Sequence, residues 1–407
     1  MNDFLKKWLG ISFLNLLLVA FLGFILRYKI AFYLPFLDQK FILHSHSHFA
    51  FTGWISQTLM VLMIWYLSRK LGDQITKRYQ KVLIINLIAA YGMFISFILQ
   101  GYGLYSIGFS TLSILVSYEF FRLYWSDLNR MKENEVSKLW FKASLIFSVL
   151  SSAGTFCLAY MMSAKIVDQN LYLASVYMFL HFQYNGWFMF AGLGLLCGKI
   201  EKFTSEKAKL KTVFILFTIA CVPAYFLSIL WAPFIHKIYP ILAIAVLAQL
   251  AGWLILLKII FRNKEILSKQ LGNNGKTLLI LSGIAFSIKL ILQTGSLHPA
   301  LSQLSYGFRP IIIGYLHLVL LGVTSIFILG YIVSFKLIPV NKMLIRGIFI
   351  FVAGVIINEL FLMIQGIAAL SYTGIPHINE MLLGAAFILL AGIFMMYVSR
   401  FTLSADQ

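Results

Sequence analysis

The chain has 407 residues, of which 60% are hydrophobic and only 12% are charged, and its formal net charge is +19. Soluble domains contain about 45–50% apolar and about 25% charged residues. This composition therefore excludes a soluble globular enzyme, a disordered chain and a secreted disulfide scaffold. A membrane span needs roughly 20 apolar residues, so the chain has room for about a dozen spans.

Apolar segments of this length follow one another along the whole chain. The first segment is too long for a signal peptide and no small-residue cleavage site follows it, so we count it as a span. We predict an all-α polytopic membrane protein, a single integral membrane domain over 1–407. Its twelve transmembrane helices are expected near 8–28, 44–67, 82–101, 104–125, 141–163, 171–197, 211–232, 239–260, 277–296, 309–333, 345–366 and 380–399.

The basic residues orient these spans. With the N-terminus inside, 26 of the 33 Lys and Arg residues fall in inner segments, six fall in outer segments, and Lys289 lies within a span. Cytoplasmic loops carry such an excess of positive charge. We therefore predict that both termini are cytoplasmic and that the protein lies in a bacterial inner membrane. We expect the basic residues to contact the lipid bilayer and not nucleic acid.

The histidines suggest an internal repeat. All eight fall in the outer half of a predicted span or in an outer loop. The pattern H-F-x-aromatic-x-G-W begins at His48 in the second span and at His181 in the sixth, and H-x4-G begins at His317 in the tenth. Because these histidines are four spans apart, we predict three pseudo-repeats of four helices, over 1–140, 141–275 and 276–407.

Histidines inside a membrane are costly and usually mark a site. Imidazole in an apolar pocket binds haem iron, copper or zinc. His44 and His48 share a helix face and His46 points nearly the opposite way, so which of the three is a ligand stays open, with His48 preferred from the repeat. The alternative is that the histidines bond carbonyls, glutamines or lipid headgroups and hold no cofactor.

The string H-S-H-F-A-F-T-G-W at 46–54 resembles the H-x-H-x4-G-[WF] signature of the second helix in relatives of haem–copper oxidase subunit I. A weaker likeness is to the NnrS family of haem- and copper-containing membrane proteins linked to nitric oxide stress. The oxidase resemblance implies twelve spans in a pseudo-threefold arrangement with cytoplasmic termini. It also implies a haem b between His48 and His317 in the outer half, and a copper ion on His181.

The resemblance is incomplete around the oxygen-reducing site. Tyr315 stands where the oxidases carry a second histidine before the one matching His317, and His236 is a single histidine where they carry an adjacent pair. We therefore do not expect a complete terminal oxidase. If a second metal binds, we expect it on His181 with help from Tyr184, His236 or His298, whereas His44 or His46 would bind a metal at the outer surface.

Two further polar residues belong to the predicted sites. Arg309 begins the tenth span at its outer edge, where it can pair with a haem propionate or simply extend to the membrane surface. Glu359 lies deep in the eleventh span, and an intramembrane acid of this kind often carries a proton or an ion.

Three classes of function fit these residues. The first is a haem-binding membrane protein in electron transport or nitric oxide handling, with an unidentified redox partner and, if it is an enzyme, oxidoreductase activity. The second is an ion-coupled transporter that uses intramembrane His and Glu, although a period of four spans differs from the usual two halves of six. The third is a copper- or zinc-binding membrane protein.

The basic asymmetry makes a prediction about topology. A reporter enzyme fused after Gln407, active only in the cytoplasm, is expected to be active, because 26 basic residues hold the inner segments inside. The same reporter inserted between Arg27 and Lys40 is expected to be silent. An active insertion with a silent fusion would reverse the orientation.

Overall fold

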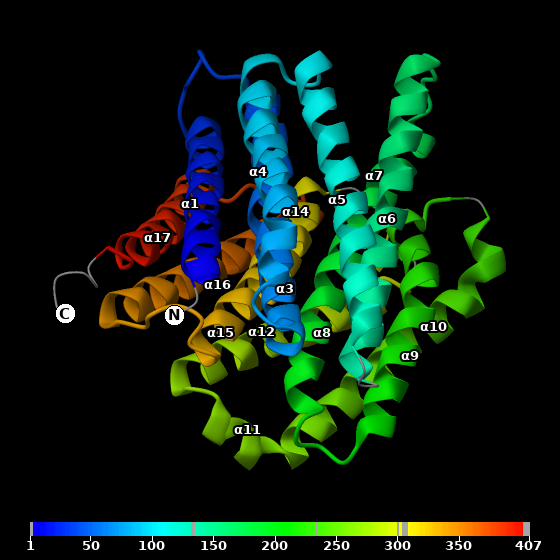
Figure 1. Cartoon of the computed structure of the whole chain (residues 1–407). Coiled ribbons are helices and arrows are strands. Elements are labelled where there is room, and N and C mark those ends of the chain that lie inside the picture. Colours follow the sequence, from blue (N-terminus) through cyan, green and yellow to red (C-terminus); the bar gives the residue numbers. More distant parts are fainter. Residues whose placement is uncertain (1–2, 132–134, 233, 299–300, 303–307, 402–407) are drawn as a thin grey trace. The chain divides into compact units, whose positions relative to one another are not determined.

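The computed structural model of the chain describes residues 3–131, 135–232, 234–298, 301–302 and 308–401, which form helices and no strand (Figure 1). In these ranges eleven helices are long and apolar enough to cross a membrane. The protein is thus a polytopic helical membrane protein, as the composition predicts.

The predicted sixth span is not among these eleven helices, because its hydropathy is lower than theirs. It forms one unbroken helical stretch made of α7 (Gln169–His181), the π-helical turn η2 (Phe182–Phe188) and α8 (Met189–Ile200). The polar residues His181, Gln183 and Asn185 lie in its middle and lower its hydropathy. A twelfth span there stays a prediction, and so do the three repeats.

The chain divides into two compact units, each described here by itself. Unit 1 comprises Met1–Phe120, Leu271–Gly283 and Phe308–Gln407. Its elements are α1 (Asp3–Ala31), α2 (Gln39–Phe49), the π-helical turn η1 (Ala50–Ser56), α3 (Gln57–Leu71), α4 (Ile75–Gln100), the first part of α5 (Leu104–Arg130), the first part of α12 (Asn273–Gly295), α14 (Arg309–His317), the π-helical turn η4 (Leu318–Ser325), α15 (Ile326–Ser334), α16 (Lys342–Leu370) and α17 (Ile378–Val398).

Unit 1 brings the two ends of the chain together. Helix α1 packs against α2, η1 and α17, so the first and last helices are neighbours (Figure 1, blue and red). Beyond the end of α17, the Arg400 guanidinium donates a 2.6 Å hydrogen bond to the carbonyl oxygen of Gly10. Helix α14 packs against α16, and α1, α2, α14 and α16 all belong to unit 1.

Unit 2 comprises Phe121–Gln270 and Ile284–Gly307. Besides α7, η2 and α8 it contains the rest of α5 and α12, together with α6 (Val136–Ser163), α9 (Lys207–Ala224), the 3₁₀ turn η3 (Tyr225–Ile229), α10 (Ile235–Arg262) and α11 (Lys264–Gln270). Helix α6 packs against α7, η2, α8 and α9, and α9 packs against α10. At the end of α8, Glu201 accepts a 2.6 Å hydrogen bond from the amide of Val136, which satisfies one free N–H at the start of α6.

Close backbone approach holds α16 and α17 together in unit 1. A Cβ added to Gly392 would lie 2.5 Å from the amide nitrogen of Phe351 and 2.8 Å from the carbonyl oxygen of Gly347. Small residues permit such contacts between membrane helices. Gly384 on the same helix has nothing within 4 Å of an added Cβ.

These two glycines form a matched pair for measurement. We expect Gly392→Ala to lower the free energy of unfolding in detergent by about 1–3 kcal/mol, because the added methyl group meets backbone atoms that cannot move aside. Gly384→Ala should be neutral or stabilising by up to about 1 kcal/mol, the usual gain of alanine over glycine in a helix. Equal effects from both variants would contradict the close packing of α16 on α17.

Candidate functional site

A π-helical turn follows each of the three repeat histidines. Turn η1 begins two residues after His48, η2 begins directly after His181, and η4 begins directly after His317. Well under 1% of residues in proteins are π-helical, and single π turns inside α-helices are frequent at functional sites. The three histidines therefore share a backbone feature as well as a sequence pattern.

Side chains from neighbouring helices bond the backbone carbonyls of the π turns in unit 1. Asn15 on α1 donates a 2.6 Å hydrogen bond to the Gly53 oxygen, and Asn86 on α4 donates one of 3.2 Å to the Thr52 oxygen. Ser282 on α12 donates a 2.8 Å hydrogen bond to the Val323 oxygen. Carbonyls within a bilayer need partners inside the protein, and here asparagine and serine supply them.

One side-chain hydrogen bond joins the two π turns of unit 1 to each other. The Trp54 indole N–H in η1 donates to the Ser325 hydroxyl at the end of η4, at 2.9 Å. Trp54 is 2% exposed and Ser325 is fully buried. The second and tenth predicted spans are thus linked just inward of their histidines.

His44 and His48 share one face of α2, as their spacing predicts, and that face meets α4. The His48 ring stacks on Phe97 with ring centroids 4.5 Å apart, and its Nε2 lies 3.0 Å from the Tyr102 hydroxyl. The His44 ring meets Tyr102 edge-on at 4.6 Å. His48 is therefore held in an aromatic pocket by residues of α4 and of the turn after it.

His46 turns the other way and packs against α1. Its Nδ1 lies 3.0 Å from the Val19 carbonyl oxygen. Its Cε1 would lie 3.1 Å from a Cβ added to Gly23, so this glycine gives the ring its room. Because a carbonyl oxygen only accepts, Nδ1 must carry the proton, and Nε2 of the neutral ring carries the free lone pair.

The structure brings His46, not His48, into the electrostatic surroundings of His317. The charged or ionisable groups that act on the His317 imidazole are Arg27 and His46. The Ile313 carbonyl also acts on the His317 ring, although the buried Nδ1 makes no well-formed hydrogen bond within the described residues. Residues 46 and 48 lie about 200° apart around a helix, so only one of them can share a face with His317. The predicted pairing of His48 with His317 stays a prediction that these contacts do not favour.

Arg309 and Glu359 are connected to His46 and His317 through their electrostatic interaction with Arg27. Both residues act electrostatically on the Arg27 guanidinium. Glu359 also accepts a 3.1 Å hydrogen bond from the Asn358 amide. We call Arg27, His46, Arg309, His317 and Glu359 the outer polar cluster; these residues come from α1, α2, α14 and α16. It holds two guanidinium groups and one carboxylate, so positive charge exceeds negative charge.

In unit 2, His181 has both ring nitrogens engaged. Nε2 donates to the Cys221 carbonyl oxygen at 2.8 Å, and Nδ1 accepts from the Asn185 amide at 3.1 Å. The ring is 2% exposed. A metal ion on His181 would have to displace one of these hydrogen bonds.

The other predicted copper ligands are dispersed. The ring centroid of Tyr184 lies 6.4 Å from that of His181, and His298 is exposed. The side chain of His236 lies outside the described part of the chain. Among the described residues no three His, Cys, Asp or Glu side chains lie together as a metal site. The predicted copper site stays a prediction without a formed ligand set.

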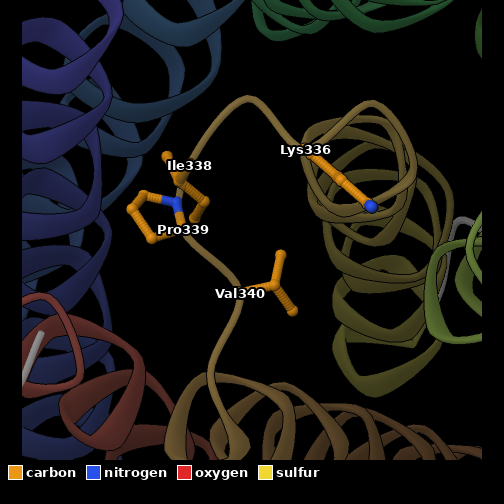
Figure 2. Close-up of a pocket in the computed structure, with 4 residues that line it drawn as sticks. All are labelled: Lys336, Ile338, Pro339 and Val340. Carbon is orange, nitrogen blue, oxygen red and sulfur yellow. The ribbon is translucent and has the colours of Figure 1, made fainter. Parts of the chain in front are cut away.

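A hollow of about 410 Å³ lies elsewhere in unit 1, at the segment between α15 and α16. Figure 2 shows the side chains that line it, Lys336, Ile338, Pro339 and Val340. None of these is a histidine or an acid. We attach no chemistry to this hollow.

Sequence reasoning missed Arg27, Asn15 and the importance of His46. Arg27 counted only as one of six outer basic residues, and Asn15 is a single amide in an apolar span. No periodicity distinguishes either from a residue at the membrane interface. Neither a family model nor a curated protein matches the chain.

The π turns make a stability prediction. We expect Asn15→Leu to lower the free energy of unfolding by about 1–3 kcal/mol, because it leaves the Gly53 oxygen and the Tyr91 hydroxyl without their partner. Denaturant titration in detergent measures it. Ser12→Ala is the control, since the buried Ser12 hydroxyl bonds only the Trp8 oxygen of its own helix. If Ser12→Ala lowered the free energy of unfolding as much as Asn15→Leu, the stabilising role of the Asn15 hydrogen bond to η1 would be contradicted.

Proposed function

We propose that unit 1 binds one b-type haem through His46 and His317, and that the protein serves electron transfer in a bacterial inner membrane. The observation that carries the proposal is the outer polar cluster, in which Arg27 and His46 act electrostatically on the His317 imidazole and Arg309 acts on Arg27. Two histidines on facing helices are the ligands of electron-transfer haems. The sequence preferred His48; the contacts of His46 favour it instead.

The His46 ring fits the part of an iron ligand. Metal-binding histidines commonly donate their other ring N–H to a backbone carbonyl, which fixes the tautomer and the ring plane. His46 has this arrangement with Val19 as the acceptor. Its Nε2 lone pair is therefore the atom we assign to iron.

The surroundings of His317 fit the second iron ligand and the propionates of a haem. A buried imidazole nitrogen without a well-formed hydrogen bond costs free energy, and His317 has one in Nδ1. Arg27 and Arg309 are close enough to repel each other, and one Glu359 carboxylate does not balance both. The two haem propionates would supply the missing negative charge, and guanidinium groups bind carboxylates well.

A haem held in this way supplies reversible one-electron transfer. The residues of the chain do the remaining work. The Val19 carbonyl orients the His46 ring, and the hydrogen bond from Trp54 to Ser325 holds the two histidine-bearing segments at a constant separation. Arg27 and Arg309 would neutralise the two haem propionates.

The finer architecture belongs to the same proposal. Twelve spans, cytoplasmic termini and three pseudo-repeats of four helices form an oxidase-like arrangement, and the π turn after each of His48, His181 and His317 supports the repeat. The fully bonded ring of His181 argues for a protein that is not a complete terminal oxidase. Nitric oxide handling remains within this class of function.

The ligand assignment is tested by three alanine variants. Wild-type protein expressed with ample haem is expected to show a reduced-haem absorbance band and the spectrum of a low-spin haem with two histidine ligands. His46→Ala and His317→Ala should lose the low-spin spectrum. His48→Ala is the matched control from the same helix and should keep it, because its ring is occupied by Phe97 and Tyr102.

The outcomes separate the alternatives. Loss in His48→Ala with retention in His46→Ala would return the ligand to the histidine that the repeat favours. A wild-type protein without any haem band would end the proposal, and the structural roles of these histidines would then be hydrogen bonding alone.

A further inference from the structure

A second buried polar cluster lies in unit 2 and is independent of the proposed haem. Lys289 on α12 is 2% exposed and lies within a candidate span. Its Nζ donates a 2.5 Å hydrogen bond to the Gln293 side-chain oxygen. The Gln293 amide in turn donates to the Gln249 side-chain oxygen on α10 at 2.8 Å. We call Lys289, Gln293 and Gln249 the lysine chain.

No carboxylate neutralises this lysine among the described residues. Its recorded neighbours there are the neutral amide of Gln293, the ring of Phe286 with its centroid 5.7 Å from Nζ, and, through electrostatics, His181 and Cys221. Buried charges in proteins are paired or neutralised, because an isolated ion in a medium of low dielectric is very costly. An intramembrane ion without a partner in the chain indicates a functional site.

Each hydrogen-bond acceptor named around Lys289 already accepts at least one hydrogen bond. The Gln293 oxygen accepts from Lys289, and the Gln249 oxygen accepts from Gln293. The Cys221 carbonyl and His181 Nδ1 accept from His181 and Asn185.

The donors, in contrast, are in excess. An ammonium group has three N–H donors and a glutamine amide has two. Only one donor of Lys289 is used among the described residues, and the Gln249 amide nitrogen has no recorded partner there. A buried ammonium group with unused N–H donors and no carboxylate beside it among the described residues is the character of an anion site.

We propose that the lysine chain binds one monovalent inorganic anion between α10 and α12. A single buried ammonium needs a single negative charge, which favours a monovalent anion over a divalent one. The anion would accept from Lys289 Nζ and from the free Gln249 amide. Nothing in this site depends on haem, because its residues belong to unit 2 and none of them is a proposed iron ligand.

Chloride is the probe, and the experiment uses the purified full-length chain in detergent. Gluconate replaces chloride at constant ionic strength, and equilibrium dialysis with radioactive chloride gives the affinity. We expect about one saturable chloride per chain and a Tm that rises with chloride concentration, since a ligand that binds only the folded state stabilises it. Lys289→Met should weaken binding by about tenfold to a hundredfold, as expected for loss of a charge-assisted hydrogen bond, and its Tm should not respond to chloride.

Two further variants keep the test decisive. Lys258→Met removes an exposed lysine of α10 and should bind chloride like the wild type. Gln249→Leu keeps the lysine and should weaken binding severalfold, which covers the case in which Lys289→Met fails to fold. A wild-type protein without saturable chloride binding, or a Lys289→Met or Gln249→Leu protein with wild-type affinity, would overturn the proposal.

Discussion

The arrangement of unit 1 depends on how backbone carbonyls find partners where no water is available. A π turn shifts the hydrogen-bond register of its helix, and side chains must then take part in satisfying the backbone. Asn15, Asn86 and Ser282 do so for η1 and η4, and each comes from a different helix. A side chain can bond a carbonyl only when its own helix lies alongside. These bonds therefore hold α1 and α4 beside η1, and α12 beside η4.

The same constraint explains why the histidines of α2 separate. Once η1 is held by α1 and α4, the helix just before it presents one face to each of them. His46 meets the Val19 carbonyl of α1, whereas His48 stacks on Phe97 of α4. The histidine that the repeat pattern favours, His48, and the histidine that acts electrostatically on His317, His46, are therefore different residues. A spacing of two residues produces this separation, since neighbours at that spacing point almost opposite ways around a helix.

The two units contain different kinds of buried polar and charged side chains. In unit 1 the outer polar cluster combines imidazoles with arginines and one carboxylate, which suits a ligand with both metal and carboxylate groups. In unit 2 His181 is fully bonded, and the charge resides on Lys289 instead. A lysine cannot ligate iron as an ammonium, but it attracts anions. Both ring nitrogens of His181 thus take part in hydrogen bonds, and the charged group that acts on this ring is Lys289.

Composition and apolar periodicity are properties of the chain alone, and they predicted a helical membrane protein. Within the described residues, eleven of the twelve predicted spans coincide with candidate spanning helices. The structure adds a feature that the sequence pattern did not predict: a π turn follows each of His48, His181 and His317. Partners could not be predicted either. The hydrogen bond of His46 with Val19 joins α2 to α1, and the one from Gln293 to Gln249 joins α12 to α10. Such contacts depend on how side chains from separate helices pack, which only the tertiary structure decides.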